Sequence, residues 1–323
     1  MSYRPPKVLV TGSFPDALNV NVAMRGYLID GFRKVLPDST VLGAPYEGAA
    51  AAACALKPDL TVIFGSAYSD ATDYNILASE VRKSGGKLVF WMHDDPYEFE
   101  GNFRVLHLLD AVFTNDAASL DFFPTDVPVF HLPMGGSYDA HYRSVVRRHG
   151  PELFFCGHVF SNRLKLFNTL AEKAPRLQRQ AILMGTGLPT GQIPGWTELR
   201  IANSSLADFC NSALSVINIG RDFHFANSRF AIKPSTPGPR TFEAAFSGAA
   251  QIVIGDGLEI VDYFEPESEI LIADSADELI DHWQRLKREP SLSLELGRKS
   301  QARAIGEHGY EHRAARILAA IYG

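Results

Sequence analysis

The stretch EILIADSADELIDHWQRLKREP, residues 269–290, joins a short apolar run to an amphipathic helix. Glu269–Ile272 carries three successive apolar residues, as expected of a strand that is covered on both faces. Ser275 and Glu278 have the spacing of a capping box, and Pro290 ends the helix. One face of Ala276–Leu286 holds its large apolar side chains, which are Leu279, Ile280, Trp283 and Leu286. The stretch therefore predicts a strand–turn–helix unit.

The same alternation of apolar runs and helical stretches recurs along the whole chain. The other predicted strands are Lys7–Val10, Thr61–Phe64, Lys87–Met92, Ala111–Phe113, Val127–Leu132, Leu153–Cys156, Ala181–Met184, Leu214–Ile219 and Gln251–Ile254. Strands that alternate with helices favour doubly wound α/β sheets with parallel strands. Two sheets of five or six strands fit the length better than one large sheet.

The length of 323 residues also favours two domains. The expected boundary lies in the polar stretch His141–Pro151, which gives domains of residues 1–148 and 149–323, and the C-terminal helix could pack back on the first domain. A basic cluster in this stretch reads as a solvated linker rather than a binding site; its members are Arg143, Arg147, Arg148 and His149.

The amino-acid composition and the net charge indicate which classes of protein the chain can belong to. With 46% hydrophobic and 21% charged residues, the chain has the make-up of a soluble globular protein. The net charge of −6 and the absence of Lys/Arg runs argue against nucleic acid as a partner. No apolar stretch is long enough to cross a membrane, and the first residues do not resemble a signal peptide. The three cysteines are scattered and lack the spacing of a disulfide framework or a metal site, so we expect a cytoplasmic protein.

The sharpest local feature is the Pro/Gly-rich loop and helix start KPSTPGPRTFEAAFSG, residues 233–248. A stiff loop leads into a short helix that Gly248 closes. The free N–H groups at the start of such a helix attract anions, and Arg240 adds a planar donor fork that suits phosphate oxygens. Glu243 could accept hydrogen bonds from ribose hydroxyls. The alternative is an ordinary capped helix.

A second polar group, His93-Asp94-Asp95, directly follows the strongest apolar strand of the first half. Ligands of such sheets bind beyond the carboxyl ends of the strands, so these side chains are candidates for proton transfer at an acceptor hydroxyl. Two alternatives stay open. Adjacent aspartates point in different directions in an extended segment, which makes a shared metal ion a weak option, and an Asx turn before Pro96 would be purely structural.

Several motifs resemble the CgeB-type glycosyltransferases, which belong to the group 1 transferases. The resemblance is densest in the second half of the chain and is sparse before Trp91. It rests on Ile217-Asn-Ile-Gly-Arg221-Asp222, Arg240-Thr-Phe-Glu-Ala-Ala-Phe-Ser-Gly248, Tyr263-Phe-Glu-Pro266, His308-Gly-Tyr-Glu-His-Arg-Ala314, Trp91-Met-His-Asp-Asp-Pro96 and Phe113-Thr-Asn-Asp-Ala-Ala-Ser-Leu120.

This resemblance implies a GT-B fold, in which two Rossmann-like domains face each other across a cleft. It implies a nucleoside diphosphate-sugar donor, most often a UDP-sugar, in the second domain, and a small-molecule, glycan or peptide acceptor in the first. No metal and no other cofactor are implied. Carried onto this chain, the donor-binding candidates are Arg240, Thr241, Glu243, Arg221, Gly157, Arg163 and Gly185, and the catalytic candidates are His93, Asp94 and Asp95.

One position departs from the family pattern. Group 1 transferases often carry a second glutamate eight residues before the one that matches Glu243, and this chain has Ser235 there. The stereochemical outcome of transfer is therefore left open. Two other functions remain: a nucleotide-sugar epimerase on the same scaffold, and a binding protein that holds the nucleotide-sugar without reacting it.

Overall fold

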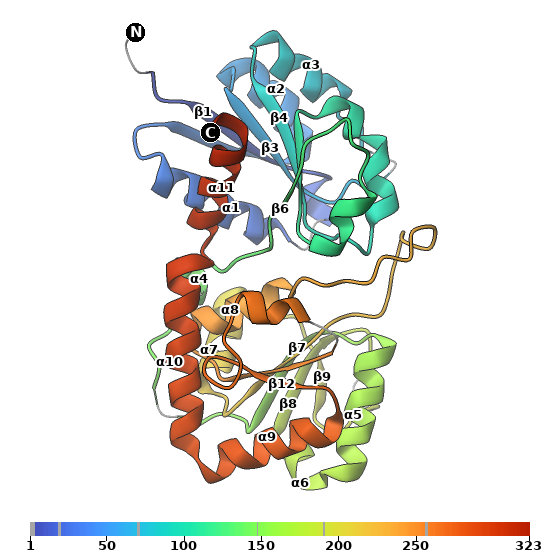
Figure 1. The fold of residues 1–323 in the computed structure, drawn as a ribbon, viewed down its shortest axis with the longest axis vertical. Helices are drawn as coiled ribbons and strands as arrows, with labels where there is room; N and C mark the ends of the chain where they lie inside the picture. Colours follow the sequence, from blue (N-terminus) through green and yellow to red (C-terminus); the bar gives the residue numbers. More distant parts are fainter. Residues whose placement is uncertain (1–3, 19–20, 70–71, 147, 190, 256–257) are drawn as a thin grey trace. The chain divides into compact units, whose positions relative to one another are not determined.

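The computed structural model describes residues 4–18, 21–69, 72–146, 148–189, 191–255 and 258–323. The chain forms two compact units, each built around a six-stranded parallel sheet (Figure 1). The first unit consists of Met1–Met134, His224–Thr236 and Tyr310–Gly323, and the second of Gly135–Phe223 and Pro237–Gly309. The predicted α/β class is confirmed. Among the described residues, no helix is both long and apolar enough to cross a membrane.

The sheet of the first unit has the strand order β2-β1-β3-β4-β5-β6. Its strands are β1 (Lys7–Gly12), β2 (Thr40–Ala44), β3 (Leu60–Gly65), β4 (Lys87–Met92), β5 (Ala111–Thr114) and β6 (Val129–His131). The sequence analysis did not predict β2. This strand lies at the edge of the sheet and is half exposed, so it lacks the continuous apolar run that marks its neighbours.

Helices cover both faces of this sheet. Its longer helices are α1 (Val22–Val35), α2 (Ala49–Leu56), α3 (Asn75–Lys83) and α11 (Tyr310–Tyr322). Phe90 of β4 belongs to a buried cluster with Ala53 of α2 and Leu77 of α3. The next residue, Trp91, points to the opposite face, where its ring lies 6.1 Å from that of Tyr310. The C-terminal helix α11 is thus part of the core of the first unit.

The sheet of the second unit has the order β12-β11-β10-β7-β8-β9. Its strands are β7 (Leu153–His158), β8 (Ala181–Thr186), β9 (Trp196–Glu198), β10 (Val216–Ile219), β11 (Gln251–Ile254) and β12 (Leu271–Ala273). The helices of this unit are α4 (Tyr138–His141), α5 (Ser161–Lys173), α6 (Pro175–Gln178), α7 (Asn203–Ser212), α8 (Pro239–Phe246), α9 (Ala276–Arg288) and α10 (Pro290–Glu307). The edge strand β9 is only three residues long and was not predicted.

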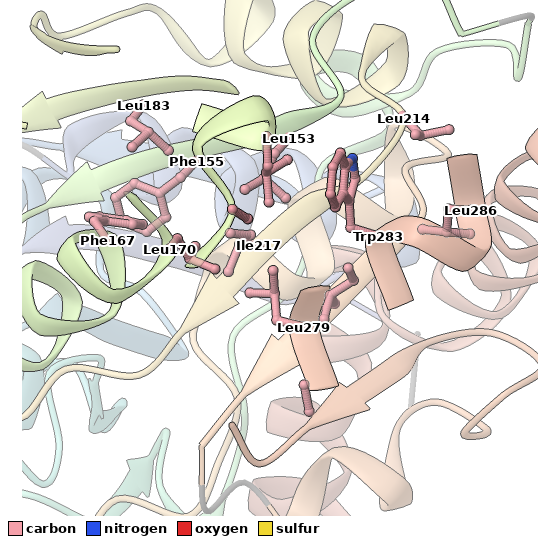
Figure 2. Close-up of a cluster of buried hydrophobic side chains, with 14 of the residues drawn as sticks. Leu153, Phe155, Phe167, Leu170, Leu183, Leu214, Ile217, Leu279, Trp283 and Leu286 are labelled. Carbon is pink, nitrogen blue, oxygen red and sulfur yellow. The ribbon is translucent and has the colours of Figure 1, made fainter. Parts of the chain in front are cut away.

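The predicted apolar face of α9 forms part of the main core of the second unit (Figure 2). Leu279, Trp283 and Leu286 are buried against the sheet. The Ser275 hydroxyl caps the helix by accepting the N–H of Glu278 at 3.2 Å. Pro290 ends α9, as predicted, and is also the first residue of α10.

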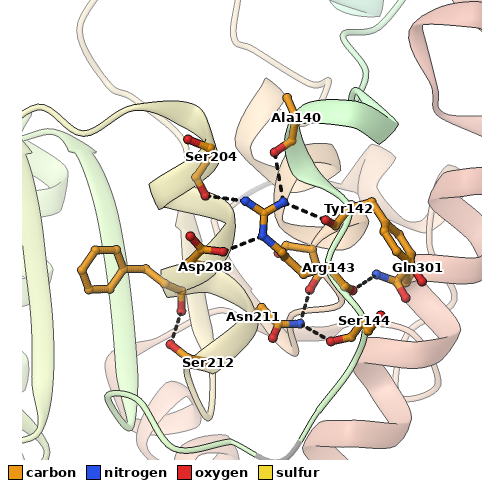
Figure 3. A network of polar contacts seen from close by, with 11 residues as sticks. Ala140, Tyr142, Arg143, Ser144, Ser204, Asp208, Asn211, Ser212 and Gln301 are labelled. Carbon is orange, nitrogen blue, oxygen red and sulfur yellow. Dashed lines mark hydrogen bonds and ion pairs between the residues drawn. The ribbon is translucent and has the colours of Figure 1, made fainter.

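The basic cluster before β7 is not a solvated linker, so that prediction is wrong. Figure 3 shows the Arg143 guanidinium bound to the Asp208 carboxylate at 2.5 Å and to the Ser204 carbonyl at 2.8 Å. The Arg148 guanidinium donates to the carbonyl oxygens of Gly248 and Ser293. These contacts fasten the segment to the second unit. Arg147 lies outside the described residues.

A segment from the second half of the sequence, His224–Thr236, belongs to the first unit; we call it the inserted segment. Ile232 is 3% exposed and lies in the same buried cluster as Phe90. The ring of Phe230 stacks on Phe103 with a centroid distance of 5.4 Å. Asn227 closes the turn that leads to Ile232. Its side-chain Nδ2 donates to the Ile232 carbonyl, and its Oδ1 accepts the Ile232 N–H. The inserted segment is therefore packed as part of the first unit.

Candidate functional site

Helix α8 presents the predicted donor-binding residues. Pro239 occupies the first turn, and the flanking Gly238 is extended and offers no side-chain cap, so the first N–H groups of the helix are not used by a capping side chain. Thr241 and Glu243 are buried. Gly248 follows the helix with φ of +70°, which confirms that it closes α8.

Arg240 and Glu243 form a close ion pair on α8. Arg240 Nη1 donates to Glu243 Oε2 at 2.6 Å. The Glu243 side chain is 6% exposed, and that of Arg240 is 33% exposed. The other terminal nitrogen of Arg240, Nη2, makes no hydrogen bond to any part of the chain that the structure describes. Glu243 therefore anchors one end of the guanidinium, while Arg240 Nε is buried and has no hydrogen-bond partner among the described residues.

His141 of α4 completes this group, and the sequence analysis did not select it. Its Nδ1 accepts the N–H of Ser137 at 3.0 Å, which leaves the ring proton of the neutral form on Nε2. Nε2 lies 3.8 Å from Glu243 Oε1. No local signal marks His141, because its partner lies far along the chain.

The charges of this group follow from burial and pairing. Burial opposes the charge of Glu243, but Arg240 and His141 outweigh it and hold the pKa of the carboxyl below its ordinary value. Burial lowers the pKa of His141, and Glu243 only partly offsets this effect. At neutral pH the group is a charged Arg240–Glu243 pair beside a neutral imidazole.

Two predicted glycines let strands β7 and β8 approach closely. A Cβ on Gly185, whose φ is +146°, would lie 1.8 Å from the carbonyl oxygen of Gly157. A Cβ on Gly157 would lie 3.3 Å from Arg163 Nη1. The structure therefore gives both glycines a role in packing the backbone at the carboxyl ends of these strands.

The two remaining predicted cations, Arg163 and Arg221, lie beyond the carboxyl ends of strands β7 and β10. The Arg163 guanidinium donates to the carbonyl oxygens of His158 at 2.7 Å and Ile219 at 2.6 Å, so much of its donor capacity is used within the unit. The Arg221 guanidinium lies 5.9 Å from the centre of the Phe160 ring. Arg163 thus lies in the first turn of α5, and Arg221 lies against Phe160, the residue that precedes this helix.

Asp222 already caps the start of α5. Its carboxylate accepts the N–H of Asn162 at 3.0 Å and also bonds the Ser161 hydroxyl. A carboxylate at a helix start is favoured by the free N–H groups and the helix dipole. Arg221 was predicted from the sequence, but the hydrogen bonds to Ser161 and Asn162 of α5 come from Asp222.

In the first unit, the structure brings His93 and Asp94 together and turns Asp95 away. His93 Nδ1 lies 2.9 Å from Asp94 Oδ2. Asp95 is 2% exposed and accepts hydrogen bonds from Asn102 at 2.8 Å and Thr114 at 2.7 Å. Burial raises the pKa of the Asp95 carboxyl to about 7. Asp95 thus holds the loop after β4 to the interior.

His93 has further polar neighbours that the sequence analysis did not select. Burial lowers the pKa of His93, but Asp94 and Glu98 raise it more, so the pKa lies above its ordinary value. Glu98 also accepts the Ser66 hydroxyl, and Asn21 Nδ2 lies 3.5 Å from His93 Nε2. These side chains gather at the carboxyl ends of β3 and β4, in agreement with the expected position of a ligand site.

Ser235, which stands where the resemblance to group 1 transferases led us to look for a second glutamate, is engaged in the first unit. Its N–H and that of Thr236 donate to Asp116 Oδ2 at 2.9 Å and 3.0 Å. The Ser235 hydroxyl accepts the N–H of Ala118 at 3.1 Å, at the start of η5 (Ala117–Phe122). The serine therefore fixes the inserted segment to the loop after β5.

Among the residues that the structure describes, no group of three or more His, Cys, Asp or Glu side chains is placed to hold a metal ion. This holds for His93, Asp94 and Asp95, which were weighed as metal ligands. The side chains of the two aspartates diverge, because Asp94 lies against His93 whereas Asp95 is directed at Asn102 and Thr114.

Comparison with known proteins finds a family similarity in the second half of the chain. Residues 163–319 match the family model described as glycosyl transferase-like. No curated protein matches significantly. Among solved structures, an α-glucosyltransferase in complex with UDP and a 13-mer DNA with a central A:G mismatch is 12% identical, with a TM-score of 0.70 and coverage of 98% of this chain and 99% of that one.

Two further solved structures resemble the chain over nearly its whole length. HepE from Anabaena, in complex with UDP and glucose, is 13% identical, with a TM-score of 0.63 and coverage of 98% of this chain and 99% of that one. A protein from Listeria monocytogenes, provisionally assigned as a UDP-N-acetylglucosamine 2-epimerase, is 13% identical, with a TM-score of 0.56 and coverage of 98% and 96%. Residues 163–319 thus match the glycosyl transferase-like family model, and the chain shares the two-domain α/β fold of these solved structures.

Proposed function

We propose that this protein is a glycosyltransferase of the CgeB type, which moves a sugar from a nucleoside diphosphate-sugar, with UDP-sugar favoured, to an acceptor. The family match over residues 163–319 and the fold shared with UDP-bound structures support this proposal. The observation that carries it is the anchored Arg240 on α8. Its Nη1 is fixed by Glu243, and Nη2 is the donor that we propose for a phosphate oxygen.

In this proposal, Arg240 stabilises the charge that develops on the departing diphosphate. Catalysis by GT-B geometry then rests on positioning and electrostatic stabilisation, without a bound metal ion. Glu243 anchors Arg240 through one carboxylate oxygen. The other oxygen faces His141 and is the proposed acceptor for a ribose hydroxyl.

The reacting acceptor hydroxyl would meet His93 in the first unit. The Asp94 carboxylate lies 2.9 Å from Nδ1 and orients the imidazole, so Nε2 is the nitrogen that can take a proton. Asp95 would support the loop without touching the substrate. The acceptor would be a small molecule, a glycan or a peptide.

The first experiment is calorimetric titration with UDP, GDP, TDP and CDP, with and without EDTA. We expect one nucleotide, UDP, to bind at micromolar concentration in both buffers. Arg240→Ala should weaken binding at least tenfold. The matched control is Glu267→Gln, which removes a distant surface partner of Arg285 in the same unit and should leave binding unchanged. If none of the four nucleotides binds, the proposal is wrong.

A second titration separates the two proposed roles of Glu243. If the carboxylate contacts the ribose, the wild-type protein should prefer UDP to 2′-deoxy-UDP, and Glu243→Gln should remove that preference. If Glu243 only anchors Arg240, the variant should weaken both nucleotides by the same factor. An unchanged affinity for both nucleotides would exclude both roles.

A nucleotide-sugar epimerase is the second candidate, because the epimerase-like protein from Listeria monocytogenes shares the fold. The two functions differ in their need for an acceptor. Incubation with donor alone, followed by NMR of the sugar, should leave the donor sugar unepimerised if the protein is a transferase. Conversion to an epimer without any acceptor would favour the second candidate. Nucleotide binding without conversion under any acceptor would indicate a binding protein.

A further inference from the structure

Two exposed aromatic rings lie in direct contact near the His93 cluster. Tyr68 follows β3 and is 40% exposed, and Phe225 of the inserted segment is 54% exposed. Their ring centroids are 4.4 Å apart with an interplanar angle of 77°, so the edge of one ring meets the face of the other. The two rings together present an exposed aromatic surface, and aromatic rings offer a large apolar contact area with a defined geometry.

The backbone that carries Tyr68 is held firmly although its ring is exposed. Tyr68 N–H donates to the Ser66 hydroxyl at 3.2 Å, and the Arg104 guanidinium donates to the Tyr68 carbonyl at 3.3 Å. A Cβ on Gly101 would lie 2.7 Å from the Tyr68 Cα, so only glycine permits this approach. A ring on such a backbone loses little entropy when it binds a ligand.

The backbone of Phe225, the other member of the pair, is also held by hydrogen bonds. The N–H groups of Phe225 and Ala226 both donate to the Tyr97 carbonyl at 2.9 Å. The Glu100 N–H donates in turn to the Ala226 carbonyl at 2.9 Å. The main chain before and after Phe225 is thereby tied to the turn that follows His93-Asp94.

Hydrogen-bond acceptors stand beside the two rings. Ser66, whose hydroxyl receives the Tyr68 N–H, donates that hydroxyl to Glu98. Glu98 is one of the two carboxylates that raise the pKa of His93. A carboxylate accepts several hydrogen bonds at once, so these groups can serve hydroxyl donors of a ligand in addition to their present partners.

We infer that the Tyr68–Phe225 pair is a stacking platform for a sugar ring, and that the acceptor of this protein is a neutral saccharide. This inference rests on the proposed glycosyltransferase function. The C–H groups on one face of a pyranose are polarised by their oxygens and lie against the electron-rich face of an aromatic ring. The hydroxyl groups at the ring edge donate to carboxylates. Asp94 and Glu98 disfavour a phosphate-bearing or otherwise anionic acceptor at this place.

Saturation-transfer difference NMR tests the inference on the full-length protein. The probes are methyl α-D-glucopyranoside, methyl β-D-galactopyranoside, methyl β-D-glucuronide and phenol, each with UDP present. We expect saturation of ring protons in at least one neutral glycoside, and a dissociation constant that rises at least fivefold in both Tyr68→Ala and Phe225→Ala. The matched control is Phe130→Ala, an exposed aromatic residue of the same unit that stacks on Phe113, and it should leave the constant unchanged.

The outcomes separate this inference from the proposed function. If UDP binds but no neutral glycoside shows saturation, or if only phenol or the glucuronide does, the saccharide platform is wrong and the transferase proposal stands. Glycoside binding that is unaffected by both substitutions also overturns the platform. Absence of UDP binding counts against the proposed function itself.

Discussion

The N–H of Ser235 donates to the carboxylate of Asp116 at 2.9 Å, across 119 positions of sequence. This bond fixes the end of the inserted segment only a few residues before Arg240. Ser235 is therefore committed to contacts in the first unit, where its short side chain also accepts the N–H of Ala118.

Asp116→Ala should release the end of the inserted segment. The backbone amides of Ser235 and Thr236 lose their shared acceptor, and a hydrogen bond to a charged group contributes about 1–3 kcal/mol. We expect these two amides to exchange with solvent deuterium about tenfold to a hundredfold faster, as measured by NMR or mass spectrometry. Asp121→Ala, which changes an exposed carboxylate of the same short helix, serves as the control. Unchanged protection of both amides would show that Asp116 does not hold the segment.

Glu243→Gln should destabilise the second unit in a pH-dependent way. The native carboxyl has a pKa below its reference value of 4.5, so its charge stabilises the folded state above that pH, and this stabilisation is lost as the pH falls through the lowered value. We expect the variant to lose about 1–3 kcal/mol of unfolding free energy at pH 7, and to approach the wild type as the pH falls below the lowered pKa of the carboxyl. Urea unfolding at several pH values measures this. A difference that does not shrink in acid would contradict the assignment of charge.

Asp95→Asn should have the opposite pH dependence. The folded pKa of Asp95 is raised to about 7 from a reference of 3.8, so wild-type stability falls as the pH rises through this range. Asparagine does not titrate, and we expect the stability of the variant relative to the wild type to rise by up to about 4 kcal/mol between pH 4 and pH 8. Asp121→Asn should show no such gain. A constant difference between Asp95→Asn and wild type across this range would mean that Asp95 does not titrate there.

Gly297→Ala should loosen the packing of α10 against the end of α8. A Cβ at position 297 would lie 2.2 Å from the carbonyl oxygen of Gly248 and 2.5 Å from Arg148 Nη2. We expect a loss of about 1–3 kcal/mol in urea unfolding. Gly306→Ala is the matched control on the same helix, because a Cβ there has no neighbour within 4 Å. That substitution should stabilise the protein by about 0.5–1 kcal/mol, through the better helix propensity of alanine.

Local patterns in the sequence were sufficient for the class of fold. Buried parallel strands are continuous apolar runs, so Lys87–Met92 and Gln251–Ile254 were predicted with their observed bounds. The edge strands β2 and β9 were missed because burial on one side only, or a length of three residues, leaves no such run. The face of α9 was predicted because its core contacts repeat with the helical period.

Only part of the candidate site could be predicted from the sequence, because several residues that contact one another there are distant in sequence. Arg240 and Glu243 are three residues apart and could be paired from helical spacing, whereas His141 has no neighbour in sequence that reveals its contact with Glu243. The divergence of Asp94 and Asp95 was expected from strand geometry, but the partners of Asp95 were not. The docking of Ser235 on Asp116 depends on tertiary packing and leaves no local pattern.

The first unit cannot be completed in the order in which the chain is synthesised. Its core includes Ile232 from the inserted segment and Tyr310 from the last helix, while Arg313 binds the carbonyl oxygens of Pro133 and Met134. The chain must therefore be synthesised at least through Arg313 before this unit can close. A stop codon just before α11 would damage the amino-terminal half of the protein most, although that half would be translated in full.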